Sequence, residues 1–252
     1  MFNNRENNDK KLFNDIANNY VKKDLTLYCR IARKQRLIRS LKGIEKPIKQ
    51  ILEVGCGAGF SVDYLKGKFI NYTGVDYSEN LINYAVKHNS DKGVEFECLN
   101  ISEFNTKFKF DVILMIGVLH HMPEPENIIK SLEKILSPKG IIVVNEPQAG
   151  NPLIGLLRKV RKKIDKNYSS DQVEFSENEI RSIFERCGHE VITYSQGLFS
   201  TPLAESRILP GFIGIPLVFI ATMLDPLLEK ILSILSIKKL TWNIVVHARR
   251  KG

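Results

Sequence analysis

The segment Ile51–Gly59 constrains the fold more than any other part of the chain. It reads ILEVGCGAG, a short apolar run typical of a buried strand, followed by glycines at alternate positions. Glycine has no Cβ, so such a turn lets the backbone approach a ligand closely before a helix begins. Phe60 occupies the position of the third glycine in the dinucleotide fingerprint G-x-G-x-x-G, which argues against NAD or FAD. No G-K-[ST] follows, so the turn is not a phosphate-binding P-loop.

The next apolar run ends in an acidic residue. It reads YTGVD at 72–76, and Asp76 lies twenty-one residues after Gly55. A carboxylate at the end of the strand beside a glycine turn can accept hydrogen bonds from both hydroxyls of a ribose. The two features together predict a nucleotide-like ligand at the carboxyl edge of a sheet.

Short apolar runs alternate with helical patterns along most of the chain. The runs that favour strands are ILEV at 51–54, YTGVD at 72–76, VEFECLN at 94–100, FDVILMI at 110–116, IIVVN at 141–145 and WNIVVHA at 242–248. Helical periodicity covers 12–20, 27–41, 60–67, 78–88, 125–136 and 176–187. Such alternation favours parallel pairing with right-handed crossovers. The sequence therefore predicts a doubly wound α/β sheet, with the run at 242–248 as an edge or near-edge strand.

Composition excludes several classes of protein. The chain has 252 residues, of which 43% are hydrophobic and 26% charged, enough for one sizeable core and unlike a disordered chain. Its four cysteines form no C-x-x-C pair, which argues against a disulfide scaffold or a zinc site; we expect no metal and a reducing, cytoplasmic compartment. The polar start, MFNNRENNDKK, predicts no signal peptide.

The net charge of +9 is concentrated in two segments. Residues 21–50 carry +8 and residues 158–166 carry +5, so the rest of the chain is net acidic by four. The second segment belongs to a helical pattern that we expect to cover the substrate. Its cations Arg158, Lys159, Arg161 and Lys162 would contact an anionic head group or phosphate on the substrate or the membrane. A solvated charged face is the alternative. Ser176-x-x-Glu179 predicts a capping box for the helix that follows.

Five motifs, in order, resemble the class I S-adenosylmethionine-dependent methyltransferases, in the branch that acts on quinones, lipids and other small molecules. They are LEVGCGAG, GVDYS, CLNISEF, FDVILMIGVLHHM and LSPKGIIVVNEP, and the resemblance runs from about residue 12 to about residue 194. It implies a Rossmann-like seven-stranded sheet whose last strand is antiparallel, a role that suits the run at 242–248. We expect a single methyltransferase domain over 1–252, with an N-terminal helical cap at 1–48, a cofactor-binding core at 49–147 and a substrate-side half at 148–252. That half includes the basic segment 158–166 and an apolar helical insertion at 203–240.

The resemblance implies S-adenosylmethionine as the cofactor and assigns residues to its parts. The methionine part would lie among Glu53, Gly55, Cys56, Gly57 and Gly59. The ribose would be held by Asp76, and the adenine would lie beside Tyr77, Asn100 and Ile101, where many relatives have aspartate in place of Asn100. The backbone carbonyls of Ile116 and Gly117 would accept from the cofactor ammonium, and Tyr20 would lie near the mouth of the site.

Two histidines follow the fourth strand, where the family's substrate pocket lies. They are His120 and His121. A sulfonium methyl donor is already activated, so in-line positioning and exclusion of water contribute most of the catalysis. A hydroxyl acceptor also benefits from a base that titrates near neutral pH, and we expect His121, or secondarily His120, to be that base. The alternative for both is packing or capping of the loop. The sequence does not name the acceptor, nor does it distinguish O-, C- and N-methylation.

Three other functions compete with methyl transfer to a small or lipid-like acceptor. A nucleic-acid methyltransferase would suit the basic segments, but GVLHH at 117–121 replaces the Asp/Asn-Pro-Pro-aromatic run of base-amine methyltransferases. A nicotinamide oxidoreductase is disfavoured by Phe60. A non-catalytic, membrane-associated binding module with the same fold is the third alternative. The oligomeric state is not indicated.

The apolar insertion contains seventeen uncharged residues at 208–224, ILPGFIGIPLVFIATML. A spanning helix needs roughly twenty apolar residues, and we expect Pro210 and Pro216, with two glycines, to break the first half. Pro226 would then start a second, amphipathic helix. We expect a helical hairpin between the sixth and seventh strands that forms an apolar surface rimmed by cations, suited to a lipid-like acceptor at an anionic bilayer. Packing into the core is the alternative.

Overall fold

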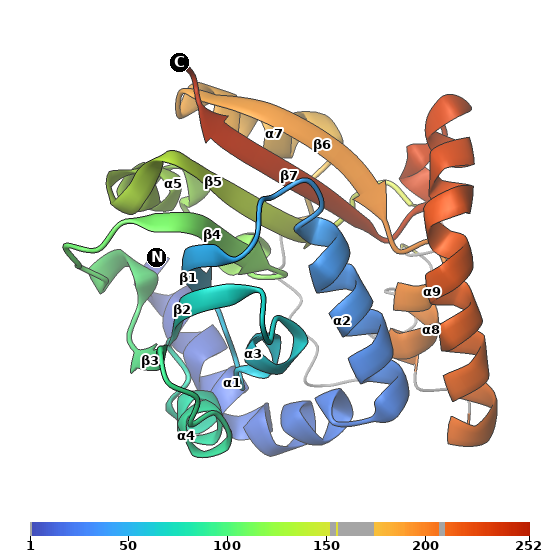
Figure 1. Cartoon of the computed structure of the whole chain (residues 1–252), viewed down its shortest axis with the longest axis horizontal. Coiled ribbons are helices and arrows are strands. Elements are labelled where there is room, and N and C mark those ends of the chain that lie inside the picture. Colours follow the sequence, from blue (N-terminus) through green and yellow to red (C-terminus); the bar gives the residue numbers. More distant parts are fainter. Residues whose placement is uncertain (1, 152–154, 156–173, 207–209) are drawn as a thin grey trace.

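The fold is built on one seven-stranded sheet (Figure 1). The computed structural model describes residues 2–151, 155, 174–206 and 210–252. The strand order is β3-β2-β1-β4-β5-β7-β6. The strands are β1 (Ile48–Val54), β2 (Phe69–Asp76), β3 (Val94–Cys98), β4 (Phe110–Ile116), β5 (Leu136–Pro147), β6 (His189–Gln196) and β7 (Asn243–Arg250). Strands β1 to β5 pair in parallel, and β7 is antiparallel to both β5 and β6. The predicted doubly wound sheet, its antiparallel last strand and the near-edge place of that strand are all confirmed.

Helices cover both faces of the sheet. They are α1 (Phe2–Asp24), α2 (Leu27–Ser40), α3 (Phe60–Tyr64), α4 (Glu79–His88), α5 (Pro125–Ile135), α7 (Glu177–Arg186), α8 (Ser200–Ser206) and α9 (Gly211–Ile234). Apolar side chains of α5 and α7 pack on one face, and those of α2 and α3 pack on the other. The central strands are buried on both faces, which is why they read as continuous apolar runs. The predicted capping box of α7 forms between Ser176 and Glu179. The basic segment 158–166 lies outside the described residues.

The apolar insertion differs from the prediction. The expected break at Pro216 and the expected new helix at Pro226 are both absent, because α9 runs through both prolines as one helix. Each proline removes one backbone hydrogen bond from a helix. The helix continues because its packing along α2 and α8, where Val218 joins a buried cluster with Cys29 and Ala204, stabilises it. The predicted hairpin between β6 and β7 therefore consists of the short α8 and the long α9.

Two buried carboxylates fix α9 to the rest of the protein. Asp225 accepts hydrogen bonds from the backbone N–H groups of Phe199 and Ser200 (2.9 and 3.1 Å) and from the Ser200 hydroxyl (2.5 Å), so it caps the start of α8. Glu229 accepts from the N–H of Gly197 (2.6 Å) and forms an ion pair with Arg39 of α2. The side of α9 that faces the protein is therefore polar at its centre.

We predict that Asp225→Ala destabilises the protein by about 2 kcal/mol, because two backbone donors and a hydroxyl lose their buried acceptor. Urea unfolding followed by circular dichroism measures the change in the free energy of unfolding. The control is Ser233→Ala, at an exposed position of the same helix. Equal unfolding midpoints for the two variants would contradict a capping role for Asp225.

Candidate functional site

The candidate site lies at the carboxyl ends of β1 and β4, where the strand order reverses. In doubly wound sheets, ligands bind in the crevice at this switch point because the connections diverge there. After β1, the backbone has positive φ at Gly55, Gly57 and Gly59. A Cβ on Gly55 would lie 2.5 Å from the side chain of Val118, and one on Gly59 would lie 2.8 Å from Phe96, so these two positions allow close packing. A Cβ on Gly57 would meet nothing within 4 Å, so Gly57 opens onto free space.

Asp76 ties the glycine turn to the end of β2. Its carboxylate is buried and accepts hydrogen bonds from the N–H of Gly57 (2.9 Å) and of Ser78 (2.8 Å). Burial raises the pKa of this carboxyl, against the lowering effect of its backbone hydrogen bonds. A carboxylate can accept about four hydrogen bonds, so Asp76 keeps capacity for hydroxyls of a ligand.

Glu53, near the end of β1, is a second buried carboxyl beside the turn. Its Oε1 accepts from the Ser61 hydroxyl (2.8 Å) and its Oε2 from the Tyr72 hydroxyl. Burial raises the pKa of Glu53 to about 7, while both hydrogen bonds lower it. The carboxyl therefore titrates near neutral pH.

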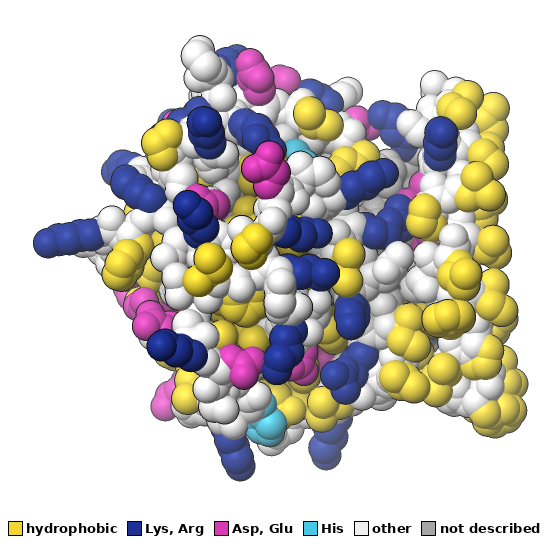
Figure 2. Space-filling view, viewed as in Figure 1, with side chains coloured by type: hydrophobic (Ala, Val, Ile, Leu, Met, Phe, Trp, Pro, Cys, Tyr) yellow, Lys and Arg dark blue, Asp and Glu magenta, His cyan; other side chains and the backbone are white. Residues whose placement is uncertain are grey.

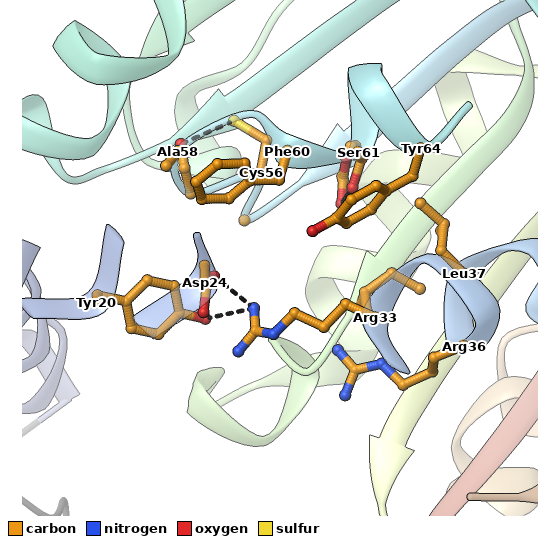
Figure 3. Close-up of a pocket in the computed structure, with 14 residues that line it drawn as sticks. Tyr20, Asp24, Arg33, Arg36, Leu37, Cys56, Ala58, Phe60, Ser61 and Tyr64 are labelled. Carbon is orange, nitrogen blue, oxygen red and sulfur yellow. Dashed lines mark hydrogen bonds and ion pairs between the residues drawn. The ribbon is translucent and has the colours of Figure 1, made fainter. Parts of the chain in front are cut away.

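A cavity of roughly 550 Å³, open solvent included, lies between this turn and the N-terminal helices (Figure 3). Its lining residues are Tyr20, Asp24, Arg33, Arg36, Leu37, Glu53, Gly55, Cys56, Gly57, Ala58, Phe60, Ser61, Tyr64 and Ile116. Figure 3 shows Arg33 reaching from α2 toward Tyr20 and Asp24 of α1, across from Phe60 and Tyr64. Helices α1 and α2 thus form one wall of the cavity, and the glycine turn, α3 and the carboxyl ends of β1 and β4 form the other.

An ion network holds this helical wall in place. Arg33 pairs with Asp24 (2.6 Å) and Glu205 (3.5 Å), and Glu205 of α8 also pairs with Lys23 (2.6 Å). Burial by itself raises the pKa of Glu205, but Lys23 and Arg33 outweigh it and hold this pKa well below its usual range. The network connects α8, and through it the apolar insertion, to the wall of the cavity.

Several buried polar atoms of the cavity wall have no hydrogen-bond partner within the described part of the chain. They are Asp24 Oδ1, Arg33 Nε, Arg36 Nε and the Tyr64 hydroxyl. Unpaired polar atoms are rare in protein interiors because each costs free energy. Their gathering around one cavity indicates a polar ligand, with the Nε–H groups of two arginines available as donors to it.

An aromatic cluster joins the cavity to the end of β4. Phe13 of α1 makes edge contacts with Tyr20 and Tyr77 (ring centroids 6.2 Å apart in both pairs) and with His121 (5.3 Å). His121 Nδ1 lies 3.1 Å from Asp9 Oδ2, also on α1. Burial lowers the pKa of His121, and the hydrogen bond to Asp9 opposes that effect. The imidazole is therefore mainly neutral at neutral pH, with a carboxylate to orient it.

His120 has a different environment. Its Nδ1 lies 2.6 Å from Oε2 of Glu146, a fully buried residue near the end of β5. The other oxygen of Glu146 accepts from the N–H groups of Val118 (2.9 Å) and Leu119 (2.7 Å). Glu146 therefore organises the whole turn Leu119–His121, and His120 is part of that support.

The structure brings together only part of the predicted site residues around the cavity. Those that line it are Tyr20, Glu53, Gly55, Cys56, Gly57 and Ile116. Asp76 adjoins it through Gly57, while Gly59 is the N-cap residue of α3. The others, Tyr77, Asn100, Ile101, Gly117, His120 and His121, do not line it.

These outlying residues flank the site. Asn100 Oδ1 accepts from the N–H (3.0 Å) and hydroxyl (2.9 Å) of Ser102, so it caps the short turn that Ile101 begins. β3 ends at Cys98, earlier than the predicted 94–100, which leaves both residues in the loop after the strand. Gly117 has a φ of 69°, and a Cβ there would meet nothing within 4 Å.

Sequence reasoning missed the contribution of the N-terminal helices. Asp9, Phe13, Asp24, Arg33 and Arg36 all belong to the site or adjoin it, and only Tyr20 was predicted to do so. The two arginines lie in the basic segment 21–50, where their charge suggested an anionic partner but their place in the cavity wall was not evident. The 3.6-residue periodicity of α2 could have separated the inward-facing cations from the solvated ones.

Comparisons with known proteins agree with this geometry. A family model described as a methyltransferase domain matches residues 45–188. The chain is similar to the ubiquinone biosynthesis O-methyltransferase of Coxiella burnetii, with 36% identity over 108 residues, which is 40% of this chain and 46% of the relative. It is also similar to the protein of the same name from Actinobacillus pleuropneumoniae, with 31% identity over 102 residues, 37% of this chain and 44% of the relative. The match thus spans about half the length of these relatives.

Solved structures share the fold over nearly the whole chain. The magnesium protoporphyrin IX methyltransferase of Synechocystis with bound SAH has a TM-score of 0.65 at 12% identity, covering 98% of this chain and 100% of that one. A SAM-dependent methyltransferase from Thermotoga maritima has a TM-score of 0.63 at 18% identity, covering 96% and 99%. At such low identity the likeness establishes the architecture alone.

We predict that Glu205→Gln destabilises the protein by about 2 kcal/mol at neutral pH, because Lys23 and Arg33 lose their shared carboxylate in a partly buried network. The folded-state pKa of Glu205 is depressed, so its stabilisation is fully present above the unfolded pKa and disappears as pH falls toward the folded value. Thermal unfolding from pH 7 to pH 3 should show the difference between wild type and variant shrinking below about pH 4.5. The exposed control Glu190→Gln should show no difference at any pH. A constant Glu205→Gln effect down to pH 3 would contradict the ion-network account.

Proposed function

The chain belongs to the S-adenosylmethionine-dependent methyltransferases, and we propose that it transfers the methyl group of this cofactor to a hydroxyl of a small or lipid-like acceptor. The observation that carries the hydroxyl assignment is the contact between His121, in the turn that follows β4, and Asp9 of α1. A hydroxyl is a poor nucleophile until it loses its proton, and a neutral, oriented imidazole can take that proton. The relatives named ubiquinone biosynthesis O-methyltransferase support the same acceptor class.

The cavity residues fit the cofactor. The open face of Gly57 accommodates a ligand against the backbone, and Asp76 has acceptor capacity for ribose hydroxyls. We assign the cofactor carboxylate to the guanidinium groups of Arg33 and Arg36, whose Nε atoms are buried and lack a partner in the described part of the protein. Glu53 lies across the same cavity.

Residues beside the cavity complete the proposed cofactor site. Tyr77, Asn100 and Ile101 would border the adenine from the ends of β2 and β3. Ile116 and Gly117 would offer backbone carbonyls to the ammonium group at the end of β4, and Tyr20 would cover the mouth from α1. The cofactor supplies a methyl group activated on sulfur, and the protein's part is alignment and exclusion of water.

His121 has the geometry of a general base held by a carboxylate. With Asp9 accepting from Nδ1–H, the neutral ring presents Nε2 as the basic atom. Nε2 would accept the hydroxyl proton as the acceptor oxygen bonds to the methyl carbon and the carbon–sulfur bond breaks toward sulfur. Asp9 then stabilises the imidazolium that forms. Phe13 packs on His121 and helps to exclude water from this region.

Replacing Gly57 tests the cofactor assignment. We predict that Gly57→Arg lowers the affinity for S-adenosylmethionine at least a hundredfold, because the side chain enters the volume the ligand needs. Gly188→Arg is the matched control, since Gly188 also has positive φ and open space but lies between α7 and β6. Isothermal titration calorimetry measures the affinity of each variant for S-adenosylmethionine, with NADH as a ligand that should not bind. Equal affinities in the two variants would refute the proposed cofactor cavity.

Replacing His121 tests the reaction type. We predict that His121→Ala lowers kcat about a hundredfold with little change in cofactor affinity, and that Asp9→Asn lowers kcat by a smaller factor. Because burial lowers the pKa of His121, we also predict that kcat stays constant through the ordinary titration range of histidine and falls only at more acidic pH, where the base becomes protonated. Transfer of labelled methyl groups to a panel of alkylated phenols and catechols measures turnover, with the exposed His88→Ala as control. Full turnover of His121→Ala would exclude the His121 base and favour C- or N-methylation driven by positioning.

A further inference from the structure

The polar and apolar sides of α9 are reversed relative to those of a helix that packs on the core of a globular protein. Its buried side chains form a narrow stripe, and they are mostly small or polar: Gly214, Val218, Ala221, Thr222, Asp225 and Glu229. Its large apolar side chains point away from the protein. At about 100° per residue, they occupy an arc roughly 160° wide on the opposite side of the helix. A helix that only completed the core would bury this arc instead.

The exposed arc runs along the whole helix, and we call it the outer face of α9. It consists of Phe212, Ile213, Leu217, Phe219, Ile220, Met223, Leu224, Leu227, Ile231 and Ile234, each of them 40–79% exposed. Figure 2 shows these apolar side chains gathered along the edge of the molecule that α9 forms. An apolar surface of this extent on a soluble protein marks an interaction site.

Among the described residues, α9 is the one helix that is long and apolar enough to cross a membrane. Its contacts with the protein argue against crossing. Asp225 caps α8 and Glu229 pairs with Arg39, so a spanning helix would carry both carboxylates into hydrocarbon or break these bonds. The helix therefore presents its side, not its end, to a partner.

The charges beside the outer face favour an anionic partner. Within residues 210–240 the two acidic side chains, Asp225 and Glu229, are buried against the protein. The cation Lys230 is exposed within the arc, near its carboxyl end; Lys238 and Lys239 follow the helix, the first partly exposed and the second exposed. The exposed charges of this segment are therefore all positive.

We propose that the outer face of α9 lies in the interfacial region of an anionic lipid bilayer, with the helix parallel to the membrane plane. An in-plane helix buries an apolar face at the boundary between acyl chains and head groups, and lysines near its end extend their ammonium groups to anionic lipids. A convex single helix offers a second copy of the chain only a narrow contact, whereas lipid surrounds the whole arc. Binding at a bilayer would hold whether or not the protein transfers methyl groups to the proposed acceptor.

Vesicle sedimentation of the full chain tests the binding. The probes are vesicles of phosphatidylcholine alone and of phosphatidylcholine with 30% phosphatidylglycerol (about one anionic lipid in three). We expect the protein to sediment with the anionic vesicles at low salt, at least tenfold more than with neutral ones, and to be partly released by added salt. Sedimentation with neither kind of vesicle at low salt would overturn the proposal, as would equal partition to both.

A pair of double variants tests whether vesicle binding depends on the outer face of α9 or on exposed apolar side chains in general. Phe219→Glu with Met223→Glu places two charges on the outer face and should reduce partition to anionic vesicles at least tenfold. Val86→Glu with Phe108→Glu makes the same change at similarly exposed positions away from α9, and it should bind like wild type. Cofactor affinity of both variants, measured in solution, confirms that each is folded and is independent of the membrane result. Equal vesicle binding by the two double variants would overturn the proposal.

Two reporter variants test the orientation. Both carry Trp242→Phe, which removes the single tryptophan of the chain. One adds Phe212→Trp and the other Ile234→Trp, near opposite ends of the outer face. We expect brominated lipids to quench both reporters to a similar depth, since an in-plane helix inserts both ends equally. Quenching of only one reporter would overturn the in-plane orientation. The outer face would instead be assigned to a second copy of the chain by two results together. The wild type would not bind vesicles, and it would form a concentration-dependent dimer that the double variant Phe219→Glu with Met223→Glu dissociates.

Discussion

The reversal of strand order between β1 and β4 is the constraint on which the candidate site depends. Because the connections from these strands leave in opposite directions, their carboxyl ends border an opening that no crossover fills. Gly57 brings bare backbone to this opening, and Asp76 fixes the turn by accepting its N–H. The turn that carries His121, the residue that we propose as the base, follows β4, so this turn and the glycine turn lie at the same edge of the sheet.

The sheet alone makes half of the site. Helices α1 and α2 supply the opposite wall, and their charged side chains are held by Glu205 from α8. α8 is in turn capped by Asp225 of α9, the helix whose outer face we place at a bilayer. The cap by Asp225, the helix α8 and the ion pairs of Glu205 therefore link the apolar insertion to Arg33 in the cavity wall. A lipid-like acceptor that arrives at α9 would therefore enter a site whose helical wall is held in place by these contacts with α8 and α9.

The sequence predicted the elements whose signals are local. Strand periodicity, the glycine turn and Asp76 each depend on a few neighbouring residues, and the sheet and the core of the cavity follow from them. Contacts between distant segments were not predictable in this way: Asp9 meets His121 across 112 positions, and Arg33 meets Glu205 across 172. The continuity of α9 through Pro216 was also missed, because packing on α2 and α8 overrides the local cost of a proline.

A crystal structure of the full chain soaked with S-adenosylhomocysteine tests the central claim most directly. We predict that the ligand occupies the cavity between the glycine turn and α2, with its ribose hydroxyls on the Asp76 carboxylate and its carboxylate within hydrogen-bond distance of Arg33 or Arg36. Density for the ligand elsewhere, or an empty cavity at saturating concentration, would contradict the account.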